Sequence, residues 1–493
     1  MLRFKIFLIL TLFSLIFILV SCSSPTESSK GSLTGTINLE GEADHSGITI
    51  ALYNLAYLDT TIVRINNQYP QLGVHINQHT EFDHRLQTPV KYTETSVDGS
   101  FELTKISTDR YNIVAFKDGW GFKYLYEIEI SKGDNDIHQQ LILFEEQHIS
   151  GNIQDNITVE TDHHLIVDAD TDFAPGTSLT ILPGAIIRIN PGDDLTIYGT
   201  LTAHGEENNM FWVTSNDGFD SSLIYNIREE LLPYNSIELS PIASVSDNLI
   251  EWGKFDYANT CLQNYADNLS FRNGIFRDGN GGLQISYANN CNISKVTSLN
   301  FVSENFGGVY YIGSSNNTIM QSIIMENNTG IRIHSTQNTE ISNNYITHCN
   351  LGVYNLINSE NTLVVNNEFI EIDTAVLNIG NSSVSVLYNL INSNIGVRDT
   401  YMASYPYNAY SYVNNNNFSC SEFAVKVECV FTGGVIVHLD AENNWWNTSE
   451  ETEIQALIWD RNDEDPLDPH YDNFAIFDYL PYHQQRIPEI GIQ

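Results

Sequence analysis

Three side chains that could bind or transform a sugar recur at one interval in the second half of the chain. Tyr310, Arg332 and Tyr354 are 22 residues apart, and each follows an aliphatic residue in an Asn-rich segment. Aromatic faces stack on pyranose rings, and a guanidinium group can bind a carboxylate through two hydrogen bonds. His334 would share the strand face of Arg332. This row predicts binding of an acidic glycan, with Arg398 as a further member and Arg332 or His334 as candidate catalytic bases.

Two acidic clusters could bind calcium, which prefers carboxylate oxygens. The first cluster has D-x-D-x-D spacing and consists of Asp168, Asp170 and Asp172. Phe173 stands where an EF-hand loop requires glycine. The second cluster lies near the C-terminus and contains Asp463, Asp465 and Asp468. Hydrated surface charge is the favoured explanation of both clusters. The sequence therefore requires no cofactor and leaves calcium as an option.

Common catalytic signatures are absent from the sequence. It contains no GxSxG, P-loop, HExxH or CxxC motif. Glycosidic hydrolysis needs paired carboxylates, but the one Asp-Asp pair, Asp193-Asp194, lies in an early predicted turn. The row around Arg332 also has a plain structural explanation, because Tyr and Arg can simply cover a sheet face that meets water. Whether the protein is an enzyme stays open, and a polysaccharide lyase is the alternative to a binding module.

The candidate row belongs to an internal repeat of about 22 residues, which is typical of stacked coils. A small residue followed by an aliphatic one recurs at Cys261-Leu262, Gly282-Leu283, Gly308-Val309, Gly330-Ile331, Gly352-Val353, Ala375-Val376 and Gly396-Val397. Each period holds at least two short strands between Asn, Gly and Ser turns. This pattern predicts a parallel β-solenoid whose coils pair at about 4.8 Å. Asn343-Asn344 and Asn366-Asn367 would then stack their amides in a ladder.

Two segments resemble the opening coils of bacterial right-handed parallel β-helix proteins of the pectin-lyase-like type. They are residues 175–189 (PGTSLTILPGAIIRI) and 195–205 (LTIYGTLTAHG). The ending, residues 442–446 (ENNWW), resembles the C-terminal cap of such proteins. The resemblance implies a β-helix over residues 151–446 and a cap with an acidic tail over 447–493. A short helix is expected after Thr448, which has capping-box spacing to Glu451.

The N-terminus predicts export to the cell envelope. Arg3 and Lys5 precede an apolar run over residues 6–20, as in a signal peptide. The sequence Leu-Val-Ser-Cys that ends at Cys22 resembles the lipobox of bacterial lipoproteins, in which the cysteine is acylated. The resemblance implies removal of residues 1–21, lipidation of Cys22 and a tether over 22–31. It also implies an outer-membrane lipoprotein, and we expect it to be exposed at the cell surface.

Residues 32–148 predict a small β-sandwich, because aliphatic and polar residues alternate in short runs. The motifs D-G-x-F, Y-x-I and K-x-G-W within residues 98–120 (DGSFELTKISTDRYNIVAFKDGW) resemble the carboxypeptidase regulatory-like, or transthyretin-like, domain. Residues 54–90 form an insertion that matches no part of this pattern. The insertion contains His75, His79 and His84, whose spacing fits no metal site, so a surface loop is expected there.

The charge balance narrows the possible partners. The chain has 22 Lys and Arg against 61 Asp and Glu, which gives a formal charge of −39 and disfavours nucleic acid as a partner. We therefore expect an all-β, lipid-anchored envelope protein whose β-helix is a binding or adhesion module, with polysaccharide and the membrane as partners. The alternatives are a lyase that acts on an acidic glycan and a purely structural envelope protein.

Overall fold

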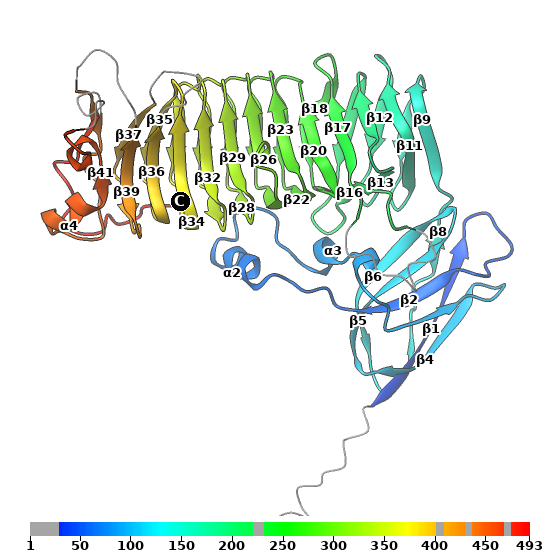
Figure 1. Cartoon of the computed structure of the whole chain (residues 1–493). Coiled ribbons are helices and arrows are strands. Elements are labelled where there is room, and N and C mark those ends of the chain that lie inside the picture. Colours follow the sequence, from blue (N-terminus) through cyan, green and yellow to red (C-terminus); the bar gives the residue numbers. More distant parts are fainter. Residues whose placement is uncertain (1–28, 220–230, 401–408, 429–435, 468–474) are drawn as a thin grey trace, which may run out of the picture. The chain divides into compact units, whose positions relative to one another are not determined.

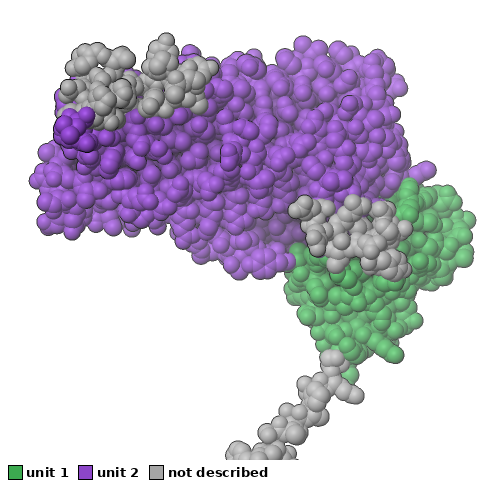
Figure 2. Space-filling model, viewed as in Figure 1, with its two compact units in different colours: residues 1–56, 87–143 green, residues 57–86, 144–493 purple. Residues whose placement is uncertain are grey.

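The computed structural model describes residues 29–219, 231–400, 409–428, 436–467 and 475–493. These residues form two compact units (Figure 2). The first unit comprises the chain up to residue 56 together with residues 87–143. The second unit comprises residues 57–86 and 144–493. The insertion that matched no pattern in the sequence therefore groups largely with the second unit.

The first unit consists of two four-stranded sheets that enclose one hydrophobic core. One sheet contains β1 (Lys30–Leu39), β4 (Ser100–Ser107), β7 (Gly133–Asp136) and β8 (Leu141–Leu143). The other contains β2 (Thr49–Asn54), β3 (Lys91–Glu94), β5 (Asp109–Lys117) and β6 (Trp120–Ile130). Every second side chain of a strand points to the same face. The apolar residues at these alternate positions, such as Leu33, Ile50 and Phe101, therefore lie in the core.

The second unit is a right-handed parallel β-helix of about 11 coils (Figure 1). A complete coil has three strands, as in β27 (Thr318–Met320), β28 (Ile323–Met325) and β29 (Thr329–His334). Equivalent strands of successive coils pair in parallel, and they build three faces that we call face A, face B and face C. The all-β fold with a parallel β-helix, predicted from the period of the repeat, is confirmed.

The strands of each face follow the order of the coils. Face A contains β10 (Ile157–Val159), β12 (Ser178–Ile181), β15 (Thr200–His204), β18 (Ser244–Glu251), β21 (Ser270–Arg272), β24 (Asn292–Ser294), β27, β30 (Glu340–Ser342), β33 (Thr362–Val365), β35 (Ser383–Leu387) and β37 (Tyr410–Asn414). Face B contains β13 (Ile186–Ile189), β16 (Phe211–Ser215), β19 (Gly253–Asp256), β22 (Ile275–Gly279), β25 (Thr297–Phe301), β28, β31 (Tyr345–Thr347) and β38 (Asn417–Phe418).

Face C contains β14 (Asp194–Ile197), β17 (Tyr234–Leu239), β20 (Ala258–Asn264), β23 (Gly281–Ser286), β26 (Gly307–Ile312), β29, β32 (Leu351–Leu356), β39 (Phe423–Glu428) and β41 (Ile458–Trp459). Four long strands contribute to both face B and face C, namely β9 (Gln147–Ile153), β11 (His164–Phe173), β34 (Glu368–Ile379) and β36 (Leu390–Thr400). Near the C-terminus, β40 (His438–Asp440) pairs with β42 (Ile476–Asp478).

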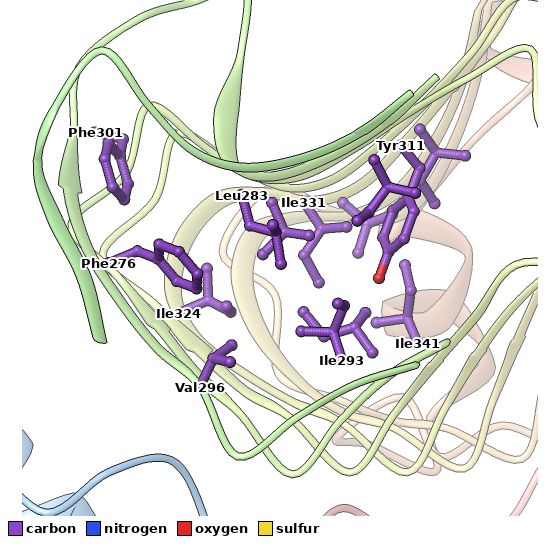
Figure 3. Close-up of a cluster of buried hydrophobic side chains, with 14 of the residues drawn as sticks. Phe276, Leu283, Ile293, Val296, Phe301, Tyr311, Ile324, Ile331 and Ile341 are labelled. Carbon is purple, nitrogen blue, oxygen red and sulfur yellow. The ribbon is translucent and has the colours of Figure 1, made fainter. Parts of the chain in front are cut away.

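Columns of aliphatic side chains fill the interior of the β-helix. Ile319, Ile341 and Val364 are paired in consecutive coils, as their 22- and 23-residue spacing predicts, and all three are fully buried. Figure 3 shows part of this interior, with Ile293 and Ile341 of face A on one side and Ile331 of face C on the other. Because each side chain stacks on its equivalent one coil away, the core runs continuously along the β-helix.

The small residue before each aliphatic one is required by the close approach of the coils. A Cβ atom at Gly330 would lie 2.7 Å from the carbonyl oxygen of Gly352, and one at Gly352 would lie 2.6 Å from that of Ala375. Larger side chains would force neighbouring coils apart at the bend from face B to face C. This contact explains the small residues of the repeat.

A buried ladder of asparagine side chains runs through the turns between face A and face B. The Asn344 amide nitrogen donates to Asn367 at 3.0 Å, and the ladder continues through Asn389 and Asn416 to Asn444. The preceding residue is Asn343 in one coil and Asn366 in the next, and both adopt positive φ angles, of 55° and 56°. The predicted ladder is confirmed and extends over five coils.

The C-terminal coil is closed by packing around Trp446, which is fully buried and stacks on Phe418 with ring centres 5.3 Å apart. Helix α4 (Glu451–Ala456) follows, as predicted. The expected capping box is wrong, because Glu450 is the N-cap residue and Thr448 instead bonds to the Glu453 carboxylate and the Glu450 backbone. A 3₁₀ turn, η3 (Arg461–Asp463), comes next.

A carboxyl group lies within a second, inward-facing polar ladder. The fully buried Asp399 accepts hydrogen bonds from Asn378 at 2.9 Å and from the Ser411 hydroxyl at 2.6 Å. Burial raises the pKa of Asp399 from an ordinary value of 3.8 to about 6, although these hydrogen bonds oppose the shift. Between these two pH values the folded protein keeps a proton that the unfolded chain releases.

We therefore expect the contribution of Asp399 to the free energy of unfolding to fall by about 3 kcal/mol as the pH rises from about 4 to 6. Asp399→Asn should lose this part of the pH dependence, which chemical denaturation at several pH values would measure. Asp155→Asn, at an exposed position, is the matched control for loss of one charge. Equal pH dependence in the native protein and in Asp399→Asn would contradict the assignment.

Candidate functional site

Residues 57–86, which we call the strap, run along face B. The strap contains α2 (Thr60–Gln68), α3 (Gln78–Glu81) and the 3₁₀ turn η1 (His84–Leu86), and Figure 1 labels both α-helices beside the coils. Its apolar side chains pack on those of β25, β28 and β31 and include Ile62, Ile65, Leu72 and Ile76. The expectation of a surface loop is wrong for His84, which is buried, and burial lowers its pKa to about 4.

Buried charges hold one end of the strap on the β-helix. Arg85 forms a fully buried ion pair with Asp83 at 2.7 Å and donates to the Ser215 carbonyl oxygen at 2.8 Å. Its guanidinium carbon lies 4.1 Å from the ring centre of Phe219. Glu81 pairs with the buried Arg277 at 2.9 Å. Because the chain itself satisfies these charges, face B is occupied here and is not the candidate site.

We expect Arg85→Met to lower the free energy of unfolding by about 3 to 5 kcal/mol, because it leaves Asp83 buried without its cation. Chemical denaturation would measure the loss, and the double variant Asp83→Asn/Arg85→Met should recover part of it. Arg110→Met is the matched control, since Arg110 pairs with Glu127 at the surface and should contribute less than about 1 kcal/mol. Equal losses in Arg85→Met and Arg110→Met would show that the buried contacts of Arg85 contribute no more to stability than a surface pair.

Face C presents a row of outward side chains in register, which we call the strip. From the middle of the β-helix toward its C-terminal end, the strip consists of Tyr310, Arg332, Tyr354, Leu377, Arg398, Lys426 and Trp459. The predicted alignment of Tyr310, Arg332 and Tyr354 is confirmed. The sequence repeat did not identify Lys426 and Trp459, because 28 and 33 residues separate the last three members instead of about 22.

Arg332 lies between the two tyrosines of the strip. Its guanidinium carbon is 5.3 Å from the ring centre of Tyr310 and 5.4 Å from that of Tyr354. One terminal nitrogen donates to the carbonyl oxygen of Glu304 at 2.7 Å, and the Nε atom has no hydrogen-bond partner among the described residues. Tyr310 is only 7% exposed, so it is the half-buried Tyr354 ring that offers an aromatic face next to the cation.

His334 joins the same group through Tyr310. Its Nδ1 atom lies 3.2 Å from the Tyr310 hydroxyl oxygen. Burial and the nearby Arg332 lower the pKa of His334, and burial raises the pKa of Tyr310. At neutral pH the imidazole is therefore uncharged and the tyrosine keeps its proton. A neutral imidazole can accept a proton from a bound molecule.

A second cationic group lies at the C-terminal end of the strip. Arg398 and Lys426 both bind Glu428, at 2.6 Å and 2.9 Å. Burial would raise the pKa of Glu428, but hydrogen bonds from these two cations lower it, so the carboxylate is charged. The Lys426 ammonium lies 5.5 Å from the ring centres of both Phe423 and Trp459. Two cations against one carboxylate leave a net positive charge beside aromatic rings.

The candidate calcium ligands are not brought together as a metal site. Among the described residues no group of three or more His, Cys, Asp or Glu side chains could hold a metal ion. Asp168 instead pairs with His148 at 3.0 Å, Asp170 accepts from the Asp194 backbone, and Asp463 accepts from the Asp460 backbone. Asp172 and Asp465 belong to no metal-binding group either, and Asp468 lies outside the described residues.

The predicted lipidation site, Cys22, also lies outside the described residues. Three other cysteines, Cys261, Cys291 and Cys349, are buried in the β-helix as expected for small apolar side chains. No helix within the described residues is long and apolar enough to span a membrane.

The chain matches a known protein family over part of its length. A family described as periplasmic copper-binding protein (NosD) matches residues 212–390, which include the first half of the strip. A search of the curated proteins gives no match.

Solved structures that resemble the chain share little sequence with it. An alginate lyase from Paenibacillus sp. str. FPU-7 is 13% identical, covers 55% of this chain and 89% of its own, and has a TM-score of 0.32. The catalytic unit of an α-1,3-glucanase from Streptomyces thermodiastaticus is 10% identical, with coverages of 94% and 87% and a TM-score of 0.40. A Family 28 exopolygalacturonase from Yersinia enterocolitica is 11% identical, with coverages of 70% and 78% and a TM-score of 0.27.

The described residues do not fit the copper site that the family's description suggests. Copper is bound by imidazole, thiolate and thioether groups that converge on one point. Here the thiols are separated within the core, and burial raises the pKa of Cys291 to about 11 and that of Cys349 to about 12. No cluster of metal-binding side chains occurs in the described ranges.

Proposed function

We propose that this protein is a lipid-anchored component of the bacterial cell envelope whose strip binds an extended acidic polysaccharide. The observation that carries the proposal is the alignment of aromatic and cationic side chains in consecutive coils of face C. We infer the lipid anchor from Cys22, which ends a segment that resembles a lipobox. The match to a family described as periplasmic supports a location in the cell envelope.

The length and charge of the strip support a polymeric ligand. Six coil-to-coil steps separate Tyr310 from Trp459, which corresponds to about 29 Å at the usual strand spacing. A polymer along the axis would meet one member of the strip in each coil. Tyrosine and tryptophan faces would stack on sugar rings, and Arg332, Arg398 and Lys426 would bind carboxylates. Since the chain carries −39 overall, the strip provides local cations that an acidic glycan needs.

We expect Arg332→Ala and Tyr354→Ala each to weaken binding of polygalacturonate or alginate at least tenfold, because each removes a group that faces the sugar. Isothermal titration calorimetry would measure this, with neutral dextran as the comparison ligand. The matched control is Tyr412→Ala, since Tyr412 is an exposed tyrosine of face A. Unchanged affinity in both strip variants, or equal loss in the control, would contradict the proposal. Higher salt should weaken binding as well.

The contact between His334 and Tyr310 favours lyase activity as a second candidate function. Arg332 would neutralise a uronate carboxylate, and neutral His334 would take the proton from the adjacent carbon. The electron pair of that C–H bond would form a double bond as the bond to the leaving oxygen breaks. The Tyr310 hydroxyl would give its proton to that oxygen.

For a lyase, we expect ultraviolet absorbance from unsaturated products on polygalacturonate or alginate. His334→Ala should abolish product while leaving polymer binding within about threefold, since the imidazole is not a main binding group. Activity should fall with decreasing pH as His334 becomes protonated, at a pH below the usual histidine range. Polymer binding without product would favour a binding module over a lyase. Product that persists in His334→Ala would exclude His334 as the base.

A further inference from the structure

An open pocket of about 460 Å³ lies beside the bend from face B to face C, separate from the strip. Tyr257, Asp278 and Asn300 occupy equivalent positions in three consecutive coils and line this pocket. Asn280 adds a further amide. The rest of the wall is mainly apolar and consists of Leu86, Leu231, Pro233, Ala258 and Val302. Leu86 is the last residue of the strap, so the strap completes one side of the pocket.

Tyr257 supplies a polar group that the described protein does not use. Its side chain is 9% exposed, and its ring centre lies 5.1 Å from the guanidinium carbon of Arg85. The buried Arg85 guanidinium therefore packs over one face of the Tyr257 ring. The Tyr257 hydroxyl forms no hydrogen bond with any described residue, and it is not among the fully buried side-chain atoms that lack a partner. It therefore meets the open pocket, where it can bond to water or to a ligand.

The other polar groups of the pocket are held in place by neighbouring coils. The Asn300 amide donates to the Asp278 carboxylate at 3.0 Å, and the Asn280 amide donates to Asn259 at 2.8 Å. The Asp278 carboxylate lies 3.5 Å from Arg277 Nε, and its side chain is 31% exposed, so it can still accept hydrogen bonds from a molecule in the pocket. The pocket therefore presents a carboxylate, two amides, a hydroxyl and an apolar wall, all on ordered coils.

We propose that this pocket binds a neutral pyranose, either as a free monosaccharide or as the end residue of a glycan. A pyranose has hydroxyl groups that match the carboxylate and amides, and C–H faces that match the aromatic and aliphatic wall. The volume is within the range of small-ligand sites. An acidic sugar is disfavoured, because its charge would lie near Asp278 in a chain of net charge −39. The pocket thus differs in ligand class from the strip and does not depend on it.

The test is a binding screen of the full chain with glucose, galactose, mannose and N-acetylglucosamine, by saturation-transfer NMR and calorimetry. Tyr257→Phe removes only the free hydroxyl, and Val302→Trp narrows the pocket from a position that is 70% exposed. We expect each to weaken the bound sugar at least tenfold without lowering the melting temperature. Tyr287→Phe, at an exposed tyrosine outside the pocket, should change nothing.

Two further comparisons distinguish a free monosaccharide from the end of a glycan, and binding in the pocket from binding on the strip. Neutral oligosaccharides that end in the bound sugar should bind more tightly than the monosaccharide if the pocket takes a glycan end, and no more tightly if it takes the free sugar. Arg332→Ala should leave this binding unchanged even where it abolishes polymer binding by the strip. The proposal is overturned if no neutral pyranose binds the native protein, if galacturonate binds as well as galactose, or if Val302→Trp binds like the native chain.

Discussion

Parallel pairing of each coil with the next is the constraint on which the rest of this structure depends. Pairing fixes the separation of equivalent residues at about 4.8 Å, so residues about 22 positions apart in the sequence become neighbours in space. Aliphatic residues stack into the core, asparagines into ladders, and outward residues into rows. The same constraint demands small residues such as Gly330, where the carbonyl group of the next coil approaches. The strip on face C is a direct product of this register.

The strap adds contacts that the repeat does not contain. It covers face B with apolar side chains and with buried ion pairs, which are strongly destabilising to break once formed. Its contacts extend along the β-helix, from Arg85 near Trp212 to Tyr69, which donates to Glu368 at 2.7 Å. The strap covers this part of face B, so it is not open to a ligand. The long row of aromatic and cationic groups lies on face C.

The sequence predicted those features that depend on a local period. The core columns, the Asn344–Asn367 ladder step and the alignment of Tyr310 with Arg332 all follow from spacings of 22 or 23 residues. The strap was not predictable in this way, because Arg85 meets Ser215 across 130 positions and the strap has no period of its own. Asp168, Asp170 and Asp172 form no metal-binding group among the described residues, since they stand at alternate positions along β11 and do not converge on one point.

Hydroxyl-radical footprinting of the full chain, with and without polygalacturonate, tests most directly whether the register of the coils creates one continuous binding surface. We predict that Tyr354, Phe423 and Trp459 become protected together as the polymer is added, while Tyr410 and Tyr412 of face A keep their reactivity. Protection of the face A tyrosines, or protection confined to one end of the strip, would contradict this account.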